Sequence, residues 1–376
     1  LPGLPIAYSM YVKKRDGVRL SVASRGVLGR HADGAWGVLL DSIVVFGIVG
    51  GVGTSLGLAV PLVSQLVSGI LGMEANFGLE VAVLCIWTAM FSASVWFGLA
   101  KGIKILSDVN VILAIFLLAF TFIVGDSQFM VEGFVNSLGK TLGNFIPMSL
   151  WTDPAGDSTF WKDWTVFYWA WWIAYAPMVG LFVARISRGR TIRELIIAEL
   201  VFGSLGTWVF FAVWGGYALD LQISGALDIK ALLDSGGIPL AVEGILQTLP
   251  YAKLVTVAFI LLCFIFLATT LDSSAYVLAS VTSRKLSGYQ EPKRSFRLIW
   301  AFLIAAVGVA LIQLGGLQTV QTSTIVVALP MIPVMLILAL SMLRWLKNDF
   351  PKEELNPVLV IDDMPAFQRK PKKTNR

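Results

Sequence analysis

The sequence predicts an all-α membrane protein, and three observations support this class. Of the 376 residues, 56% are hydrophobic and only 14% are charged, which is too apolar for a soluble globular chain of this size. Apolar runs of about 20 residues, long enough to cross the hydrocarbon core of a bilayer, recur along the chain. Lys and Arg residues concentrate in alternate segments between these runs, as they do in cytoplasmic loops.

We expect about eight complete membrane helices after an incomplete first one. The first runs from Ile6 to Val12 into the basic stretch Lys13 to Arg15. The complete spans are predicted at 37–69, 78–98, 108–125, 164–184, 195–218, 253–283, 297–315 and 322–343. Because no initiator Met or targeting segment precedes the first helix, we expect the chain to begin partway through a longer protein, N-terminally truncated.

The distribution of basic residues predicts the orientation of these spans. All but four of the 29 Lys and Arg residues lie in segments assigned to the cytoplasmic side, the exceptions being Lys140, Lys162, Lys230 and Lys253. We therefore expect a multi-pass protein of the cell (plasma or inner) membrane with both ends of the chain cytoplasmic. The net charge of +5 follows from this bias and from the tail 344–376, which we expect to contact anionic lipid. Nucleic-acid binding is not expected.

The segment 163–175 is the richest in aromatic residues. Residues three, four and seven apart share a helix face, so one stripe is predicted to contain Trp164, Phe167, Tyr168, Trp171 and Tyr175. Trp169 and Trp172 form a second stripe beside it. Stacked aromatic rings from which water is excluded can bind a permanently charged organic cation such as a quaternary ammonium. The segment therefore favours a small-molecule carrier. The alternative is an aromatic belt at the membrane interface.

The span 253–283 carries hydroxyls and an acid at its middle, notably Thr269, Thr270 and Asp272. An acidic side chain inside a membrane span is energetically costly, so its presence there by default indicates a functional role. Carbonyls freed at an unwound turn, together with the hydroxyls, are able to coordinate Na⁺. Alternatively, the hydroxyls bond to carbonyls of the preceding turn and Asp272 forms a structural pair.

The sequence gives little support for a phosphate-binding loop, a disulfide, a zinc site or enzyme activity. The glycines of the span 37–69 are not followed by Gly-Lys-Ser/Thr, so we interpret them as sites of close helix packing. His31 is the single histidine, and Cys85 and Cys263 lie inside apolar runs, so a disulfide or a zinc site is not expected. We expect no enzyme activity, no catalytic residues, no cofactor and no metal other than a coupling Na⁺.

These segments resemble the betaine/choline/carnitine transporter family. Its signature, Trp-Thr-x-x-(Phe/Tyr)-Trp-x-Trp-Trp followed by Ala-Arg-Ile-Ser-Arg-Gly-Arg-Thr-Ile-Arg-Glu, is matched at 164–172 and 184–194. The resemblance extends through 55–58, 106–110 and 269–273. It implies an inverted five-helix-repeat transporter fold, a substrate site at the bilayer midplane and a homotrimer.

The resemblance also implies a division of the chain. The expected units are the end of a membrane helix and a cytoplasmic basic loop at 1–36, the last three helices of repeat one at 37–125, an external amphipathic helix and loop at 126–162, the five helices of repeat two at 163–343, and a cytoplasmic basic tail at 344–376. The opening helices of repeat one would precede residue 1.

Carried over by position, Trp171 and Trp172 are expected to form part of a tryptophan box around the trimethylammonium group. The expected lining of an outer site on the approach consists of Phe167, Trp169 and Tyr175, with Trp164 close by. An ion site is implied at Phe266, Thr269 and Thr270.

Two positions depart from the family pattern. Tyr175 stands where some members have Trp. Ile48 and Val52 replace hydroxyls that serve a second sodium in some members, which argues against coupling to two sodium ions.

The implied function is secondary active uptake of a quaternary ammonium or similar onium osmolyte, such as glycine betaine, choline, carnitine or dimethylsulfoniopropionate. Coupling to Na⁺ or H⁺ is expected. Two alternatives remain open, namely ion-independent exchange of substrate for product, and a membrane osmosensor whose basic tail reads the charge of the membrane.

Overall fold

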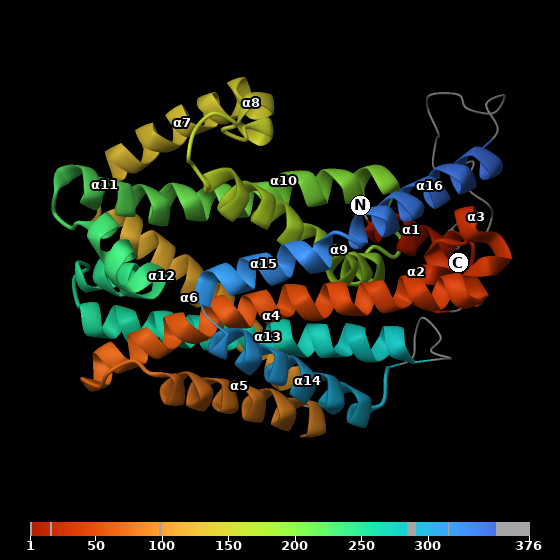
Figure 1. Cartoon of the computed structure of the whole chain (residues 1–376), viewed down its shortest axis with the longest axis horizontal. Coiled ribbons are helices and arrows are strands. Elements are labelled where there is room, and N and C mark those ends of the chain that lie inside the picture. Colours follow the sequence, from red (N-terminus) through yellow and green to blue (C-terminus); the bar gives the residue numbers. More distant parts are fainter. Residues whose placement is uncertain (1, 16, 98–99, 284–290, 315, 351–376) are drawn as a thin grey trace, which may run out of the picture.

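The computed structural model describes residues 2–15, 17–97, 100–283, 291–314 and 316–350, and all regular secondary structure in these ranges is helical. The long helices lie side by side in a bundle (Figure 1). Seven of the described helices are long and apolar enough to cross a membrane, and a further apolar helix covers Phe77–Ala93. The predicted class, an all-α membrane protein, is therefore confirmed.

Seven of the eight predicted complete spans correspond to single helical stretches. The long helices are α4 (Ala35–Leu71), α5 (Phe77–Phe97), α6 (Ala100–Val124), α9 (Phe167–Ile186), α10 (Ile192–Phe210), α13 (Ala252–Thr282) and α14 (Arg294–Gln313). π-helical turns extend two of them, because η3 (Trp161–Val166) precedes α9, while η4 (Phe211–Gly215) and α11 (Gly216–Ser224) follow α10. The ends of the predicted spans 78–98 and 297–315, and the predicted tail from residue 351 onward, lie outside the described residues.

The expected span 322–343 is two helices rather than one. Helix α15 (Gly316–Ala328) ends just before Pro330, and α16 (Met331–Asp349) begins directly after it. Proline has no backbone N–H and its ring clashes with the carbonyl four residues earlier, so it interrupts a helix. The apolar residues continue through this point, which is why hydropathy alone did not reveal the break.

Short helical turns form the N-terminal part of the chain. They are α1 (Gly3–Ala7), η1 (Tyr8–Val12), α2 (Leu20–Ala23), α3 (Arg25–Leu28) and η2 (Gly29–Asp33). Helix α1 packs against α9, and α3 packs against α16. Asp349, the last residue of α16, accepts a hydrogen bond of 2.6 Å from the Tyr8 hydroxyl and pairs with Lys13 Nζ at 2.5 Å. These contacts tie the two ends of the described chain together.

Three further helices occupy the two long polar segments. Helix α7 (Ser127–Gly143), followed by α8 (Phe145–Leu150), forms where an amphipathic helix was predicted. It begins at Asp126, whose carboxylate accepts a hydrogen bond from the backbone N–H of Phe129 at 2.9 Å. Helix α12 (Ile229–Gln247) is kinked at its Gly-Gly-Ile-Pro sequence, where Gly237 has a φ of 68° that favours glycine.

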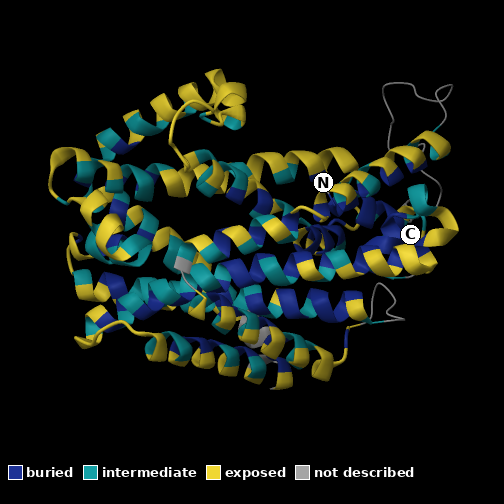
Figure 2. Ribbon diagram, viewed as in Figure 1, coloured by how far each residue is buried: buried dark blue, intermediate teal, exposed yellow. Residues whose placement is uncertain are grey.

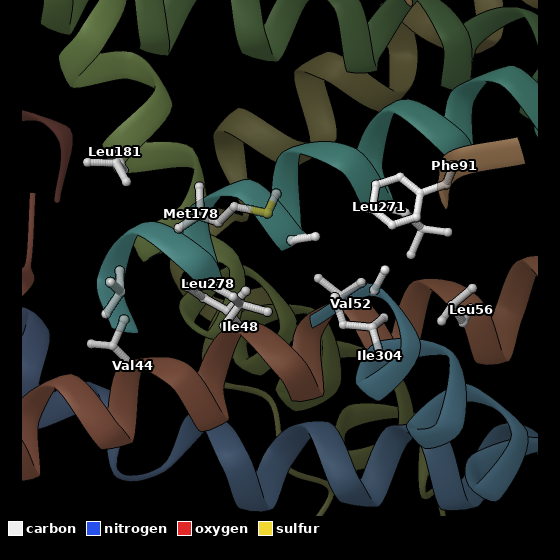
Figure 3. Close-up of a cluster of buried hydrophobic side chains, with 14 of the residues drawn as sticks. Val44, Ile48, Val52, Leu56, Phe91, Met178, Leu181, Leu271, Leu278 and Ile304 are labelled. Carbon is white, nitrogen blue, oxygen red and sulfur yellow. The ribbon is translucent and has the colours of Figure 1, made fainter. Parts of the chain in front are cut away.

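Helix α4 lies at the centre of the core. One of its faces, from Val44 through Ile48 and Val52 to Leu56, is buried against side chains of α5, α9, α13 and α14 (Figure 3). By contrast, the apolar residues of α10 are mostly exposed (Figure 2). Such a surface is stable beside lipid tails, because α-helices satisfy their backbone hydrogen bonds internally.

Glycines let α4 approach its neighbours closely. A Cβ atom on Gly51 would lie 2.9 Å from the Tyr175 ring, and one on Gly57 would lie 2.5 Å from a Val320 methyl group. Both distances are shorter than atoms of real side chains allow. The interpretation of these glycines as sites of close helix packing is therefore confirmed.

We predict opposite effects of alanine at two helical glycines. Gly57→Ala should lower the melting temperature of the purified protein, because the added methyl group collides with Val320 and overpacking costs about 1–3 kcal/mol. Gly203→Ala, on the open surface of α10 with no atom within 4 Å, should raise it slightly, because alanine is the better helix former. Thermal unfolding followed by size-exclusion chromatography measures both. Equal shifts in the two variants would contradict close packing at Gly57.

Candidate functional site

One face of α9 and the preceding π-helical turn carries a continuous stack of aromatic rings. The rings of Trp164 and Tyr168 are 6.1 Å apart at 24°, and those of Phe167 and Trp171 are 5.6 Å apart at 20°. Tyr175 then meets Trp171 edge to face, with ring centroids 6.2 Å apart. These separations are favourable for aromatic pairs. The five residues of this stack are the first stripe predicted from helical spacing.

Two hydrogen bonds to α4 hold the deeper rings of the stack in place. The indole Nε1 of Trp171 donates to the carbonyl of Gly51 at 3.2 Å. The hydroxyls of Tyr175 and Ser55 are bonded at 2.7 Å. Gly51 has no side chain, so the Tyr175 ring lies directly over its backbone. The orientations of Trp171 and Tyr175 are therefore set before any ligand binds.

Trp169 and Trp172 lie apart from this stack. Their side chains are 57% and 65% exposed in the described chain, whereas Phe167 is buried to 1% exposure. Successive residues on an α-helix point about 100° apart, so Trp171 and Trp172 are directed to different sides of α9. The structure thus brings together Trp164, Phe167, Trp171 and Tyr175 among the predicted substrate residues, and leaves Trp169 and Trp172 on an open face.

The predicted ion segment lies in an unbroken part of α13. Helix α13 is continuous from Ala252 to Thr282, so the unwound turn that we considered is not found there. The hydroxyls of Thr269 and Thr270 both donate to the carbonyl oxygen of Phe266, at 2.8 and 3.1 Å. This is the bonding to a preceding turn that the sequence left as the alternative. These two hydrogen bonds bring together the three oxygen atoms predicted for the ion site, the carbonyl oxygen of Phe266 and the hydroxyl oxygens of Thr269 and Thr270. The Phe266 ring points outward and is 64% exposed.

A charged cluster lies within the next two turns of α13. Asp272 forms an ion pair with Arg297 of α14 at 2.6 Å. The guanidinium carbons of Arg185 and Arg297 lie 4.7 and 5.4 Å from the centre of the Tyr276 ring, which is a cation–π geometry. The ion pair corresponds to the alternative that the sequence left open, in which Asp272 forms a structural pair. Sequence analysis missed Tyr276, although the spacing of four residues from Asp272 places both on one helix face.

A cavity of about 340 Å³ between α9 and α13 joins these features. Its lining includes Arg185 of α9 together with Thr269, Thr270, Asp272 and Tyr276 of α13. The volume is within the range of about 300–1,000 Å³ that small-molecule sites occupy. The cavity is therefore large enough for a small organic molecule and presents both hydroxyls and charges to it.

The stacked aromatic side chains of η3 and α9, from Trp164 to Tyr175, form an aromatic wall. Such a wall and a polar cavity among long apolar helices are typical of a membrane transport protein. Residues 1–351 match the family model described as "BCCT, betaine/carnitine/choline family transporter". The chain belongs to this family, whose members are transporters rather than enzymes.

Two relatives support this membership. The chain is 33% identical to "Uncharacterized transporter YeaV" of Escherichia coli (strain K12) over 375 residues, covering 99% of this chain and 78% of that protein. It is 35% identical to "Carnitine transporter" of Acinetobacter baumannii over 357 residues, covering 94% of this chain and 64% of that protein.

We predict that the Ser55–Tyr175 hydrogen bond couples α4 to α9. Ser55→Ala and Tyr175→Phe should each lower the free energy of unfolding by about 1 kcal/mol, the usual net contribution of a hydrogen bond. The double variant should lose less than the sum, because either change alone breaks the same bond. Melting temperatures of the four proteins measure the coupling. Strictly additive losses would show that the two hydroxyls are stabilised separately.

Proposed function

We propose that the protein carries a quaternary ammonium or similar onium osmolyte across the membrane by secondary active transport. The observation that supports this most is the pair of aromatic faces on α9, one stacked and anchored, the other open. The similarity to a protein named as a carnitine transporter supports the same substrate class. Glycine betaine, carnitine, choline and dimethylsulfoniopropionate all belong to it.

In this proposal the onium group binds first against Trp172 on the open face of α9, and Trp171 offers a second ring on the stacked face. A quaternary ammonium has no N–H to donate, so the negative face of an aromatic ring is its main source of attraction, contributing about 2 kcal/mol per ring when water is excluded. The ring of Trp172 is 65% exposed and thus accessible. Trp171 is already oriented by the Gly51 carbonyl, so binding does not have to order it.

The remaining aromatic residues are assigned to the approach. Trp169 offers a second exposed ring on the same open face. Phe167 is buried and acts through Trp171, on which it stacks at 5.6 Å. Trp164 and Tyr175 lie at the two ends of the stack, so together these side chains extend the aromatic wall along α9.

We further propose that Na⁺ couples transport at the oxygens of Phe266, Thr269 and Thr270. Carbonyl and hydroxyl oxygens are the ligands that transporter helices offer to sodium. The two hydroxyls already lie within 2.8 and 3.1 Å of the Phe266 carbonyl, so small rotations would direct three oxygens at one ion. Ion binding in one conformation would then shift the alternating-access equilibrium towards it.

A second candidate is exchange of substrate for product without an ion. It is favoured by the continuity of α13, because both hydroxyls are satisfied within the helix. Uptake with Na⁺ replaced by K⁺, and separately with the proton gradient collapsed, distinguishes the two mechanisms. Dependence on neither ion, with uptake requiring internal substrate, would support exchange.

The basic segments support a cytoplasmic assignment for one end of the bundle. Helices α2, α3 and the end of α16 lie together at this end (Figure 1), and they carry basic residues including Arg25 and Lys347. Loops rich in Lys and Arg stay in the cytoplasm. We propose that both ends of the described chain face the cytoplasm of a cell with the protein in its plasma or inner membrane.

We predict that Trp172→Leu lowers onium uptake by about 30-fold, because losing a cation–π contact of about 2 kcal/mol corresponds to that factor. Trp36→Leu is the matched control, since Trp36 is similarly exposed, at 62%, but lies at the start of α4. Uptake of labelled glycine betaine, carnitine and choline into proteoliposomes gives the comparison. Unchanged uptake by Trp172→Leu would exclude this residue from the substrate site.

We also predict a selective effect on sodium. Thr269→Ala and Thr270→Ala should each raise the Na⁺ concentration for half-maximal uptake by about tenfold, because each removes a ligand worth at least about 1.4 kcal/mol. Thr256→Ala is the control on the same helix, since its hydroxyl also bonds to a preceding carbonyl, that of Ala252 at 2.8 Å. An equal change in all three variants would point to helix stability rather than ion binding.

A further inference from the structure

Helix α15 contacts the Trp164 end of the aromatic wall through one buried side chain. Gln321 of α15 is buried, and its side-chain Nε2 donates a hydrogen bond of 2.6 Å to the backbone carbonyl of Asp163. Asp163 lies in the π-helical turn η3, directly before Trp164, the first ring of the wall. This hydrogen bond therefore joins α15 to the backbone from which the wall begins.

Helix α15 is itself fixed to two neighbouring helices. Ala174 of α9 and Ala328 of α15 belong to one buried cluster, and the hydroxyls of Thr324 and Thr54 form a hydrogen bond between α15 and α4. Small side chains and hydroxyl bonds of this kind hold helices together in a bilayer. Gln321 lies three residues before Thr324 on α15, so its amide extends from a firm support.

The π-helical form of η3 sets the direction of the Trp164 side chain. A π-helical turn is closed by hydrogen bonds five residues apart and is wider than an α-helical turn, so residues before it are rotated relative to those after it. A side chain that inserts into the backbone ladder is one cause of such irregular turns. The Gln321 amide is placed to stabilise η3, and with it the stacking of Trp164 on Tyr168 at 6.1 Å.

The two ends of the wall are supported in different ways. Trp171 and Tyr175 bond through their own side chains to Gly51 and Ser55 of α4. At the other end, the support acts on the backbone beside Trp164. A support on the backbone fixes the direction of a ring without using the ring's own N–H, so the ring is ordered before a ligand arrives.

We propose that Gln321 is a positioning residue for Trp164, on which it acts by holding the π-helical turn η3. The proposal rests on the function proposed above, in which Trp164 belongs to the approach of an onium substrate. The contact to Trp172 is not altered by a change at Gln321. Loss of the Gln321 bond should therefore raise the KM for uptake and leave the maximal rate almost unchanged.

Uptake kinetics of the whole transporter in proteoliposomes test this role. Gln321→Met keeps the length of the side chain without its amide and should raise the KM for glycine betaine about fivefold, the factor that corresponds to one lost hydrogen bond. The maximal rate should change by less than about twofold, whereas a damaged fold would lower it. Gln321→Asn keeps an amide on a shorter side chain and should give a smaller rise in KM.

Ser323→Ala is the matched control on the same helix. The Ser323 hydroxyl donates to the carbonyl of Val320 at 2.9 Å, so this substitution also removes one hydrogen bond, but one that lies within α15. Its KM should stay within about twofold of the wild-type value. An equal rise in KM for Ser323→Ala and Gln321→Met would point to α15 as a whole and contradict a specific role of Gln321.

A second test identifies the residue through which Gln321 acts. In a protein that already carries Trp164→Ala, Gln321→Met should change the KM by less than about twofold, because its target is gone. Fluorine NMR of the detergent-solubilised protein labelled with 5-fluorotryptophan gives a measurement without substrate. The Trp164 resonance, assigned by its loss in Trp164→Ala, should shift in Gln321→Met, and the Trp171 resonance should not.

The outcomes separate the two proposals. A rise in KM that persists in the Trp164→Ala background, or an unmoved Trp164 resonance, would overturn the positioning role and leave the onium carrier standing. A wild-type protein that transports no onium compound would contradict the proposed function, and the fluorine resonances would still decide whether Gln321 positions Trp164. If Gln321→Met does not fold, the same comparisons are made with Gln321→Asn.

Discussion

Close packing of α4 against its neighbours determines the position of nearly every other feature. Helices α9, α13, α14 and α15 all contact it, and side chains at Gly51 and Gly57 would collide with Tyr175 of α9 and Val320 of α15. Inside a bilayer, burial of apolar surface adds little to helix association, so close van der Waals contact and hydrogen bonds have to supply the stability. The bonds from Trp171 to the Gly51 carbonyl and from Tyr175 to Ser55 belong to the same contact. The packing of α4 against α9 therefore also sets the orientation of the Trp171 and Tyr175 rings.

Helix α9 joins two environments that differ in electrostatic character. Its first part, as far as Tyr175, presents aromatic rings, and its last part presents Arg185 to a cavity with an ion pair at its edge. Pro177 lies between them and removes one backbone hydrogen bond. The length of α9 therefore separates an aromatic environment from a charged one.

Patterns within one helix were predictable, and contacts between helices were not. The 3.6-residue period placed Trp171 with Phe167 and Tyr175 in one stripe, and hydropathy located the long helices. By contrast, the pairing of Asp272 with Arg297 joins residues on different helices, and no local pattern specifies which faces meet. The break before Pro330 was hidden by apolar residues on both sides. The roles of Trp172 and Thr269 in binding stay predictions, because they depend on ligands as well as on the chain.

The contacts of Asp349 with Tyr8 and Lys13 also constrain the order in which the protein can mature. The Lys13–Asp349 pair spans 336 positions in the sequence, and the ribosome makes the first partner long before the second. Helix α1 can pack against α9 as soon as α9 is inserted, whereas α3 gains its distant neighbour only when α16 emerges. Multi-helix chains fold from the N-terminus as they are synthesised, and unfinished surfaces are the ones prone to misassembly. This end of the bundle can therefore close only after α16 has been made.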